Sequence, residues 1–173
     1  MRIRNLLILV AVLAVWLGLD ISTKSFFNGC QVGDVIVGPF FGIFQFTLVH
    51  NTGAAWGIFG DSTLLLGLFS LLVCLMVVLY MFVFAPDTGS VQAIGLSLVI
   101  AGGVGNAIDR FAYGYVVDFI EPVFIDFPVF NIADIGVTCG VAIFLIATIV
   151  RMAKGEKALG GKDDSNGKDA FDA

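Results

Sequence analysis

The 173-residue chain is too apolar and too poor in charge to be an ordinary soluble domain. Apolar residues make up 58% of it and charged residues 13%, whereas soluble domains average roughly 45–50% and about 25%. The net charge of −5 comes partly from an acidic C-terminal tail and identifies no partner. Composition therefore indicates a membrane protein.

Four apolar runs are long enough, or nearly long enough, to cross a bilayer core, which takes about 20 helical residues. We expect helices, because lipid offers no partner for an open backbone. The expected fold is an α-helical membrane protein with one domain over residues 1–152 and a disordered cytoplasmic tail over residues 153–173. The four runs are Leu6–Leu19, Leu64–Phe84, Val91–Gly105 and Ile135–Val150.

Basic residues predict how the spans are oriented. Four spans place both termini on one side, and the positive-inside rule makes the side richer in Lys and Arg the cytoplasm. Loops 25–63 and 109–133 are then extracytoplasmic, and Arg110 is their single basic residue. Seven of the nine basic residues lie near the termini: Arg2, Arg4, Arg151, Lys154, Lys157, Lys162 and Lys168.

The first run is expected to remain in the protein as a span. It begins like a secretory signal peptide, with two arginines before an apolar stretch, but no small-residue cleavage site follows it. Asp20 and Lys24 come directly after it. Because they are four residues apart, they share a helix face. We expect either a structural ion pair at the span end or a pair that orients neighbouring site residues.

Residues 34–49 change to a strand pattern. The segments Val35–Val37 and Phe44–Val49 are rich in β-branched and aromatic residues, with glycine and proline between them, which predicts two strands and a turn. We expect a small extracytoplasmic β-sheet on the outer membrane surface. Asn51 or Thr52 can then cap a short interfacial helix that reaches Phe59.

Glycines cluster near the end of the third run. Small residues at Gly102, Gly103 and Gly105 let another helix or a bound substrate approach the backbone closely. The three cysteines of the chain do not suggest a disulfide framework. Two of them, Cys74 and Cys139, fall inside apolar runs, where we expect small packing residues.

Ionisable and amide side chains concentrate between the third and fourth runs. Because such side chains cost free energy in a largely apolar membrane chain, their concentration indicates a functional site. Asp109 lies at the outer end of the third run, Asp118 in the strand-like run Tyr115–Ile120, and Asp134 where the fourth helix is expected to start. Two helix ends and one loop can therefore bring the three together. No Cys–His or Ser–His pairing and no metal-ligand spacing is found, so paired carboxylates are the remaining catalytic option.

Two close carboxylates share one proton at neutral pH, because a second negative charge beside the first is costly. One acid can then take a proton from water while the other donates to a carbonyl oxygen, which hydrolyses a peptide bond without a metal. The macrodipole favours charge on Asp134 at a helix N-terminus, which leaves Asp118 as the proton holder. The same acids also fit an ion-coupled transporter or a buried polar network in a scaffold.

Five short motifs in order make the chain similar to a known family over about residues 5–150. They resemble lipoprotein signal peptidase (signal peptidase II), the aspartyl peptidase of the bacterial inner membrane. The motifs are Asp20-Ile-Ser-Thr-Lys24, Asn51-Thr-Gly53-Ala-Ala55, Gly105-Asn106-Ala-Ile-Asp109-Arg110, Val116-Val117-Asp118-Phe119 and Phe130-Asn131-Ile-Ala133-Asp134.

The resemblance implies an activity and a location. The family removes the signal peptide from diacylglyceryl-modified prolipoproteins, cleaving on the N-terminal side of the lipidated cysteine at the outer face of the cytoplasmic membrane. The expected partners are these lipid-modified prolipoproteins and membrane lipids, with no nucleic acid, and a monomer is expected. No metal and no other cofactor is implied.

The resemblance also implies three sets of site residues. Asp118 and Asp134 match the catalytic pair. Glu121 and Asp126 are expected to be solvated loop acids outside the site. Four matched positions hold substrate and shape the site: Asn51, Asn106, Arg110 and Asn131. Four more are supporting positions: Asp20, Lys24, Gly53 and Asp109.

Overall fold

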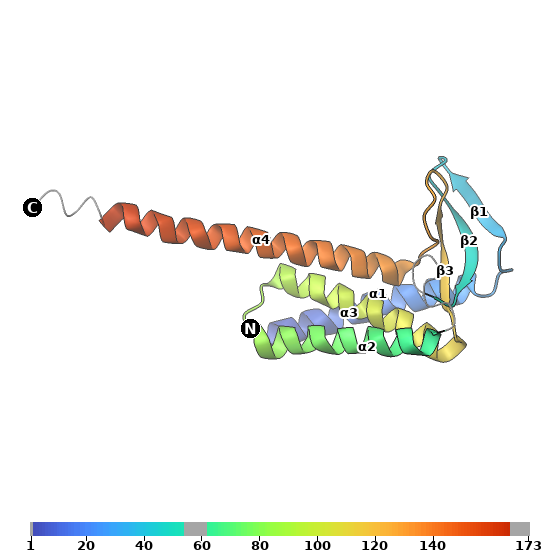
Figure 1. The fold of residues 1–173 in the computed structure, drawn as a ribbon, viewed down its shortest axis with the longest axis horizontal. Helices are drawn as coiled ribbons and strands as arrows, with labels where there is room; N and C mark the ends of the chain where they lie inside the picture. Colours follow the sequence, from blue (N-terminus) through green and yellow to red (C-terminus); the bar gives the residue numbers. More distant parts are fainter. Residues whose placement is uncertain (1, 54–61, 167–173) are drawn as a thin grey trace, which may run out of the picture.

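The computed structural model describes residues 2–53 and 62–166, with side chains as far as Lys154. Figure 1 shows four helices with a three-stranded sheet at one end, while α1 begins and α4 ends away from the sheet. The elements are α1 (Arg2–Phe27), β1 (Val35–Phe40), β2 (Phe44–Asn51), α2 (Thr63–Leu79), the π-helical turn η2 (Tyr80–Phe84), α3 (Ser90–Tyr113), β3 (Val116–Pro122) and α4 (Ile132–Asn166).

Four stretches of these helices are long and apolar enough to cross a membrane: Arg2–Phe27, Thr63–Phe84, Ser90–Tyr113 and Ile132–Lys154. Each is longer than the apolar run that predicted it, because the polar residues at the ends of the runs continue the helix. The predicted fold class of four spans and a small sheet is confirmed. Helix α4 continues past residue 152, to Asn166; the domain boundary and the disordered tail stay predictions.

Helix α3 is the central helix of the bundle and packs against α1, α2 and α4. More than half of its most apolar stretch is buried, whereas less than a fifth of the corresponding stretch is buried in each of the other three helices. Glycines allow this packing: a Cβ on Gly95 would lie 2.7 Å from the Gly140 carbonyl oxygen, and a Cβ on Gly102 would collide with the backbone of Ala133. The predicted close approach at the glycines is therefore made by other helices.

The sheet is antiparallel, with β2 between β1 and β3. It is joined to the end of α1 by Phe27, whose ring stacks on that of Phe119 at 4.2 Å between centroids. Leu48 and Val117 complete this small core. Because the core holds β3 against α1, the middle of β3 lies directly over the outer end of the bundle.

Of two expectations about the outer segments, the one for Glu121 was wrong and the one for a short interfacial helix stays a prediction. Glu121 is not a solvated loop acid: it lies in β3, half-buried, and accepts hydrogen bonds from the Thr47 hydroxyl and the Gln45 amide. The predicted short interfacial helix begins at Asn51, which is the last residue of β2. Residues 54–59 of that predicted helix lie outside the described residues.

Candidate active site

Asp118 is placed by the register of the sheet. It pairs with Val49 across β2 and β3, and Asn51 pairs with Val116. Because alternate residues of a strand share a face, Asn51 and Asp118 are diagonal neighbours, and Asn51 Nδ2 donates to Asp118 Oδ2 at 2.9 Å. The carboxylate is only 2% exposed.

Asp134 is placed by the start of α4. Asn131 is the residue before the helix, and its Oδ1 accepts from the Asp134 backbone N–H at 3.0 Å. In return, the Asn131 backbone N–H donates to Asp134 Oδ2 at 3.1 Å. This reciprocal pair is a capping box, built here from Asn and Asp. A second donor to the carboxylate, Asn106 Nδ2, lies 2.7 Å from Asp134 Oδ1.

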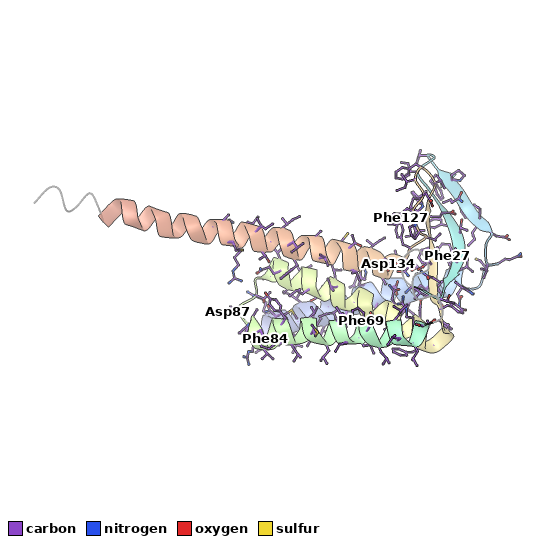
Figure 2. All side chains as sticks on the ribbon, viewed as in Figure 1. Phe27, Phe69, Phe84, Asp87, Phe127 and Asp134 are labelled. Carbon is purple, nitrogen blue, oxygen red and sulfur yellow. The ribbon has the colours of Figure 1, made fainter. Side chains whose placement is uncertain are left out.

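Asn131 joins the two carboxylates, since its Nδ2 also donates to Asp118 Oδ1 at 2.7 Å. Asp118 and Asp134 line one cavity of about 480 Å³, together with Asn51, Asn106 and Arg110. Figure 2 shows Asp134 at the junction of the bundle and the sheet, with Phe127 above it. The sequence prediction that these two acids meet is therefore matched by the geometry.

Burial and charge set the proton affinity of Asp118. Removal from water and, to a smaller extent, the negative charge of Asp134 raise the pKa of Asp118, hydrogen bonds from Asn51 and Asn131 lower it, and the net result is a pKa of about 7. An ordinary carboxyl group has a pKa near 3.8. Asp118 is thus protonated in about half of the molecules at neutral pH, beside a second carboxylate in the same cavity.

Asp109 takes a different place from the other two aspartates. It lies away from the cavity, in a buried ion cluster in which Lys24 Nζ is 3.1 Å from Asp109 Oδ2 and 2.9 Å from Asp20 Oδ2. Asp109 Oδ2 also accepts from the Val117 backbone N–H at 3.1 Å. Of the three aspartates, Asp118 and Asp134 line the cavity, while Asp109 is held by Lys24 and by the start of β3.

The ion cluster contacts the site through Asn106. Lys24 Nζ donates to Asn106 Oδ1 at 3.0 Å, and Asn106 in turn donates to Asp134. Asp20 Oδ1 accepts from the Ala133 backbone N–H at 2.9 Å, at the start of α4. Both alternatives for the Asp20–Lys24 pair are therefore present: it is an ion pair, and it contacts the residues that hold the carboxylates.

Arg110 ties α3 to the end of β2. Its Nη1 donates to the Asn106 carbonyl and its Nη2 to the Gly53 carbonyl, each at 3.3 Å. The Gly53 backbone N–H donates to Asn51 Oδ1 at 3.0 Å, which turns the Asn51 amide toward Asp118. Within the described residues, the buried Nε of Arg110 has no hydrogen-bond partner.

Sequence analysis missed part of the cavity wall. Thr138 and Cys139 line it, one helical turn after Asp134, and so does the loop segment that includes Phe127 and Phe130. The i+4 spacing from Asp134 could have identified Thr138. Cys139 is exposed in the cavity and is not a packing residue, whereas Cys74 is buried as expected. Among the described residues, no three His, Cys, Asp or Glu side chains could hold a metal ion.

Known proteins share this sequence pattern. The family model described as "Signal peptidase (SPase) II" matches residues 12–150. The lipoprotein signal peptidase of Gloeobacter violaceus is 40% identical, with 82% of this chain and 80% of that protein covered. The lipoprotein signal peptidase of Gloeothece citriformis is 38% identical, with 86% and 92% covered.

The fold is also shared with solved structures. A bacterial membrane enzyme has a TM-score of 0.72 and 31% identity, with 87% of this chain and 90% of that chain covered. A second structure of a bacterial membrane enzyme has a TM-score of 0.67 and 32% identity, with 83% and 91% covered.

Proposed function

The chain belongs to the signal peptidase II family, and we propose that Asp118 and Asp134 are its catalytic pair. Its relatives are lipoprotein signal peptidases, so this protein is an aspartic-type enzyme that removes signal peptides from lipoproteins. A transporter that uses the same carboxylates is not supported by these similarities. The single observation that carries the proposal is the cavity in which one buried, raised-pKa carboxyl group lies beside a second carboxylate.

The two acids have different surroundings and therefore different roles. The Asp134 carboxylate accepts one hydrogen bond from the Asn106 side chain and one from the Asn131 backbone N–H. It lies at the N-terminus of α4, a place that favours the charged form. It takes a proton from the attacking water. Asp118 carries the proton that is donated to the scissile carbonyl oxygen, so the attack and the protonation occur together. When the C–N bond breaks, Asp134 gives the proton that it took from water to the leaving amine, and a hydroxyl group of the tetrahedral intermediate returns a proton to Asp118.

Three polar residues on the cavity wall are proposed to hold the substrate: Asn51, Asn106 and Arg110. The guanidinium of Arg110 lines the cavity, and its N–H groups suit a peptide carbonyl oxygen of the substrate. Asn131 contacts both carboxylates, so its proposed role is to shape the site. Asp20, Lys24, Gly53 and Asp109 are proposed to support these residues through the contacts described above.

The proposed location is the bacterial cytoplasmic membrane, with both termini in the cytoplasm and the cavity at the outer face. Two observations support it: α1 begins and α4 ends at the end of the bundle away from the sheet (Figure 1), and the basic residues gather there. The scissile bond of a diacylglyceryl prolipoprotein lies at the outer surface, level with the two acids. We propose a monomer that contacts membrane lipids along its exposed helix faces.

Incubation of the purified protein with a lipid-modified precursor tests the catalytic pair. Asp118→Asn and Asp134→Asn are each expected to reduce cleavage by more than about a thousandfold, because each removes a proton-transfer group. Asp126→Asn, the same change at an exposed acid in the loop after β3, is the matched control and should keep full activity. Cleavage is measured by the mobility shift of the precursor on a gel.

Two results would contradict the proposal. Full activity of either Asp118→Asn or Asp134→Asn, with folding verified by circular dichroism, would remove that residue from the catalytic pair. Equal cleavage of a precursor without diacylglycerol would show that lipid modification is not required, which would overturn the proposed substrate and leave the assignment of the two acids intact.

A further inference from the structure

A second cavity lies at the other end of the bundle, between the start of α3 and the middle of α4. It measures about 570 Å³ and is lined on the α3 side by the segment from Gly89 to Gln92. Figure 2 shows Phe84 and Asp87 at this end of the bundle, far from Asp134. The cavity is therefore separate from the proposed active site.

The α4 wall of this cavity is an apolar stripe that ends in two positive charges. Its apolar members are Ile143, Ile146, Ala147 and Val150, and its basic members are Arg151 and Lys154. The spacing of these six residues puts them on one face of the helix. The apolar part, from Ile143 to Val150, is about 10 Å long at 1.5 Å per residue, which is about two-thirds of one leaflet of a hydrocarbon core roughly 30 Å thick. The stripe can therefore contact the part of an acyl chain nearest to the headgroup.

Arg151 is held in position by a buried partner. Its Nη1 donates to Gln92 Oε1 and to the Asp87 carbonyl, each at 3.1 Å. Gln92 is buried and is itself held, because its Nε2 donates to Thr148 Oγ1 at 2.8 Å. Both contacts of Arg151 found among the described residues use Nη1. Its Nε and Nη2 therefore remain for a ligand.

The start of α3 adds further positive potential to the same end of the cavity. The backbone N–H groups of Ser90 and Val91 are among the first of the helix and have no acceptor within it. Together with Arg151 and Lys154 they suit a phosphate group. No carboxylate lines the cavity among the described residues; the nearest acid in sequence, Asp87, contacts Arg151 through its backbone oxygen.

We propose that this cavity binds one anionic phospholipid, with its phosphate against Arg151, Lys154 and the start of α3 and one acyl chain along the stripe from Ile143 to Val150. A soluble anion would leave the apolar wall in water, and a lipid without net charge would leave both cations unneutralised. An anionic lipid satisfies both parts of the cavity. The proposal uses no residue of the proposed catalytic pair.

Native mass spectrometry of the full-length protein in a neutral detergent tests the proposal. We expect one dioleoyl phosphatidylglycerol to bind at saturation and dioleoyl phosphatidylcholine to bind at least tenfold more weakly. Arg151→Gln should weaken phosphatidylglycerol binding about fivefold. Arg2→Gln, which removes the same charge from an exposed residue of α1 outside the cavity, should leave it unchanged. Excess inorganic phosphate should not displace the lipid.

A second variant pair tests the acyl chain. Ala147→Trp fills the cavity and should reduce phosphatidylglycerol binding at least tenfold, whereas Ile149→Trp, on an exposed face of α4 outside the cavity, should not. Equal binding of the two lipids, equal loss in Arg151→Gln and Arg2→Gln, or displacement by phosphate alone would each overturn the proposal. If Ala147→Trp does not fold, the comparison of Arg151→Gln with Arg2→Gln tests the proposal by itself.

Discussion

At the scale of single residues, one asparagine sets how the two acids meet. Asn131 caps α4 through a reciprocal pair of hydrogen bonds with Asp134, and the same side chain donates to Asp118. The position of Asp134 is thus fixed by a local rule of helix capping. The position of Asp118 relative to Asp134 depends on the side-chain amide of Asn131, which lies in the connection between β3 and α4.

The raised pKa of Asp118 makes the reaction sensitive to pH. Its pKa in the folded protein is about 7, so the protonated form that donates to the substrate is lost as pH rises through 7. The cleavage rate should therefore fall above about pH 7, approaching tenfold for each further unit. Initial rates on a lipid-modified precursor between pH 5.5 and 9 measure this, with Asp126→Asn expected to share the wild-type profile.

The same shift has a second, spectroscopic consequence. Because the negative charge of Asp134 raises the pKa of Asp118, Asp134→Asn should lower that pKa. Carbon-13 NMR of labelled aspartate carboxyls follows the titration directly and needs no activity. A cleavage rate that climbs steadily from pH 6 to pH 9, or an Asp118 signal that titrates near 4 in the wild type, would contradict the assigned proton holder.

At the scale of elements, a buried ion cluster joins the outer ends of α1 and α3. Lys24 on α1 contacts Asp20 on its own helix and Asp109 on α3, and its third contact is Asn106. The three ionic side chains are all buried. Burial of an ion cluster is tolerated only when each charge keeps its partners, so the cluster orients the helix that carries Asn106.

Removal of Lys24 should be costly for stability. Lys24→Met leaves Asp20 and Asp109 buried without their cation, and the expected loss is about 3–5 kcal/mol of unfolding free energy. Adding Asp20→Asn removes one unpaired charge and should restore part of the loss. Unfolding in dodecyl sulphate, followed by circular dichroism, provides the measurement. A Lys24→Met protein within about 0.5 kcal/mol of the wild type would show that the cluster does not stabilise the bundle.

Glycine packing between α3 and α4 gives another prediction at this scale. Gly102→Ala places a Cβ against the backbone of Ala133, the residue before Asp134, and should push the start of α4 away from Asn106. We expect at least tenfold lower activity, because Asp134 loses a donor. Gly18→Ala on α1, where a Cβ meets open space, is the matched control and should be neutral or slightly stabilising. Equal activity of the two variants would contradict this account.

At the scale of the whole molecule, the two ends of the bundle differ in chemistry. One end carries the sheet (Figure 1), and the cavity with the two acids lies there. The other end carries basic residues and the second cavity. The central helix α3 runs between them. This polarity suits an enzyme that is held in one orientation across a membrane and acts at one surface.

The orientation can be measured directly. In a cysteine-free background, a cysteine introduced by Asp126→Cys should react with an impermeant maleimide in intact spheroplasts, because this exposed loop residue lies on the sheet side. A C-terminal epitope tag should be cleaved by protease only in inverted vesicles. The reverse pattern would show that the positive-inside argument assigns the wrong side.

The amino-acid sequence by itself determined the spans, the strands and the family of this protein. Run length and composition identified four spans, and β-branched residues indicated strands of the sheet. Five motifs identified the family and predict Asp118 and Asp134 as the catalytic pair. These features are local, since each depends on residues within a few positions of one another. The family is shown by matches over most of the chain.

Only the tertiary structure decided which polar residues share the cavity. Helical spacing puts Asn106 and Asp109 on one side of α3, yet Asn106 reaches Asp134 while Asp109 is held by Lys24 and the Val117 backbone. Cys139 likewise lines the cavity because of how α4 is rotated against its neighbours. Spacing shows which residues share a face of one helix. The rotation of that helix against its neighbours, set here by contacts such as Gly102 against Ala133, decides what the face meets.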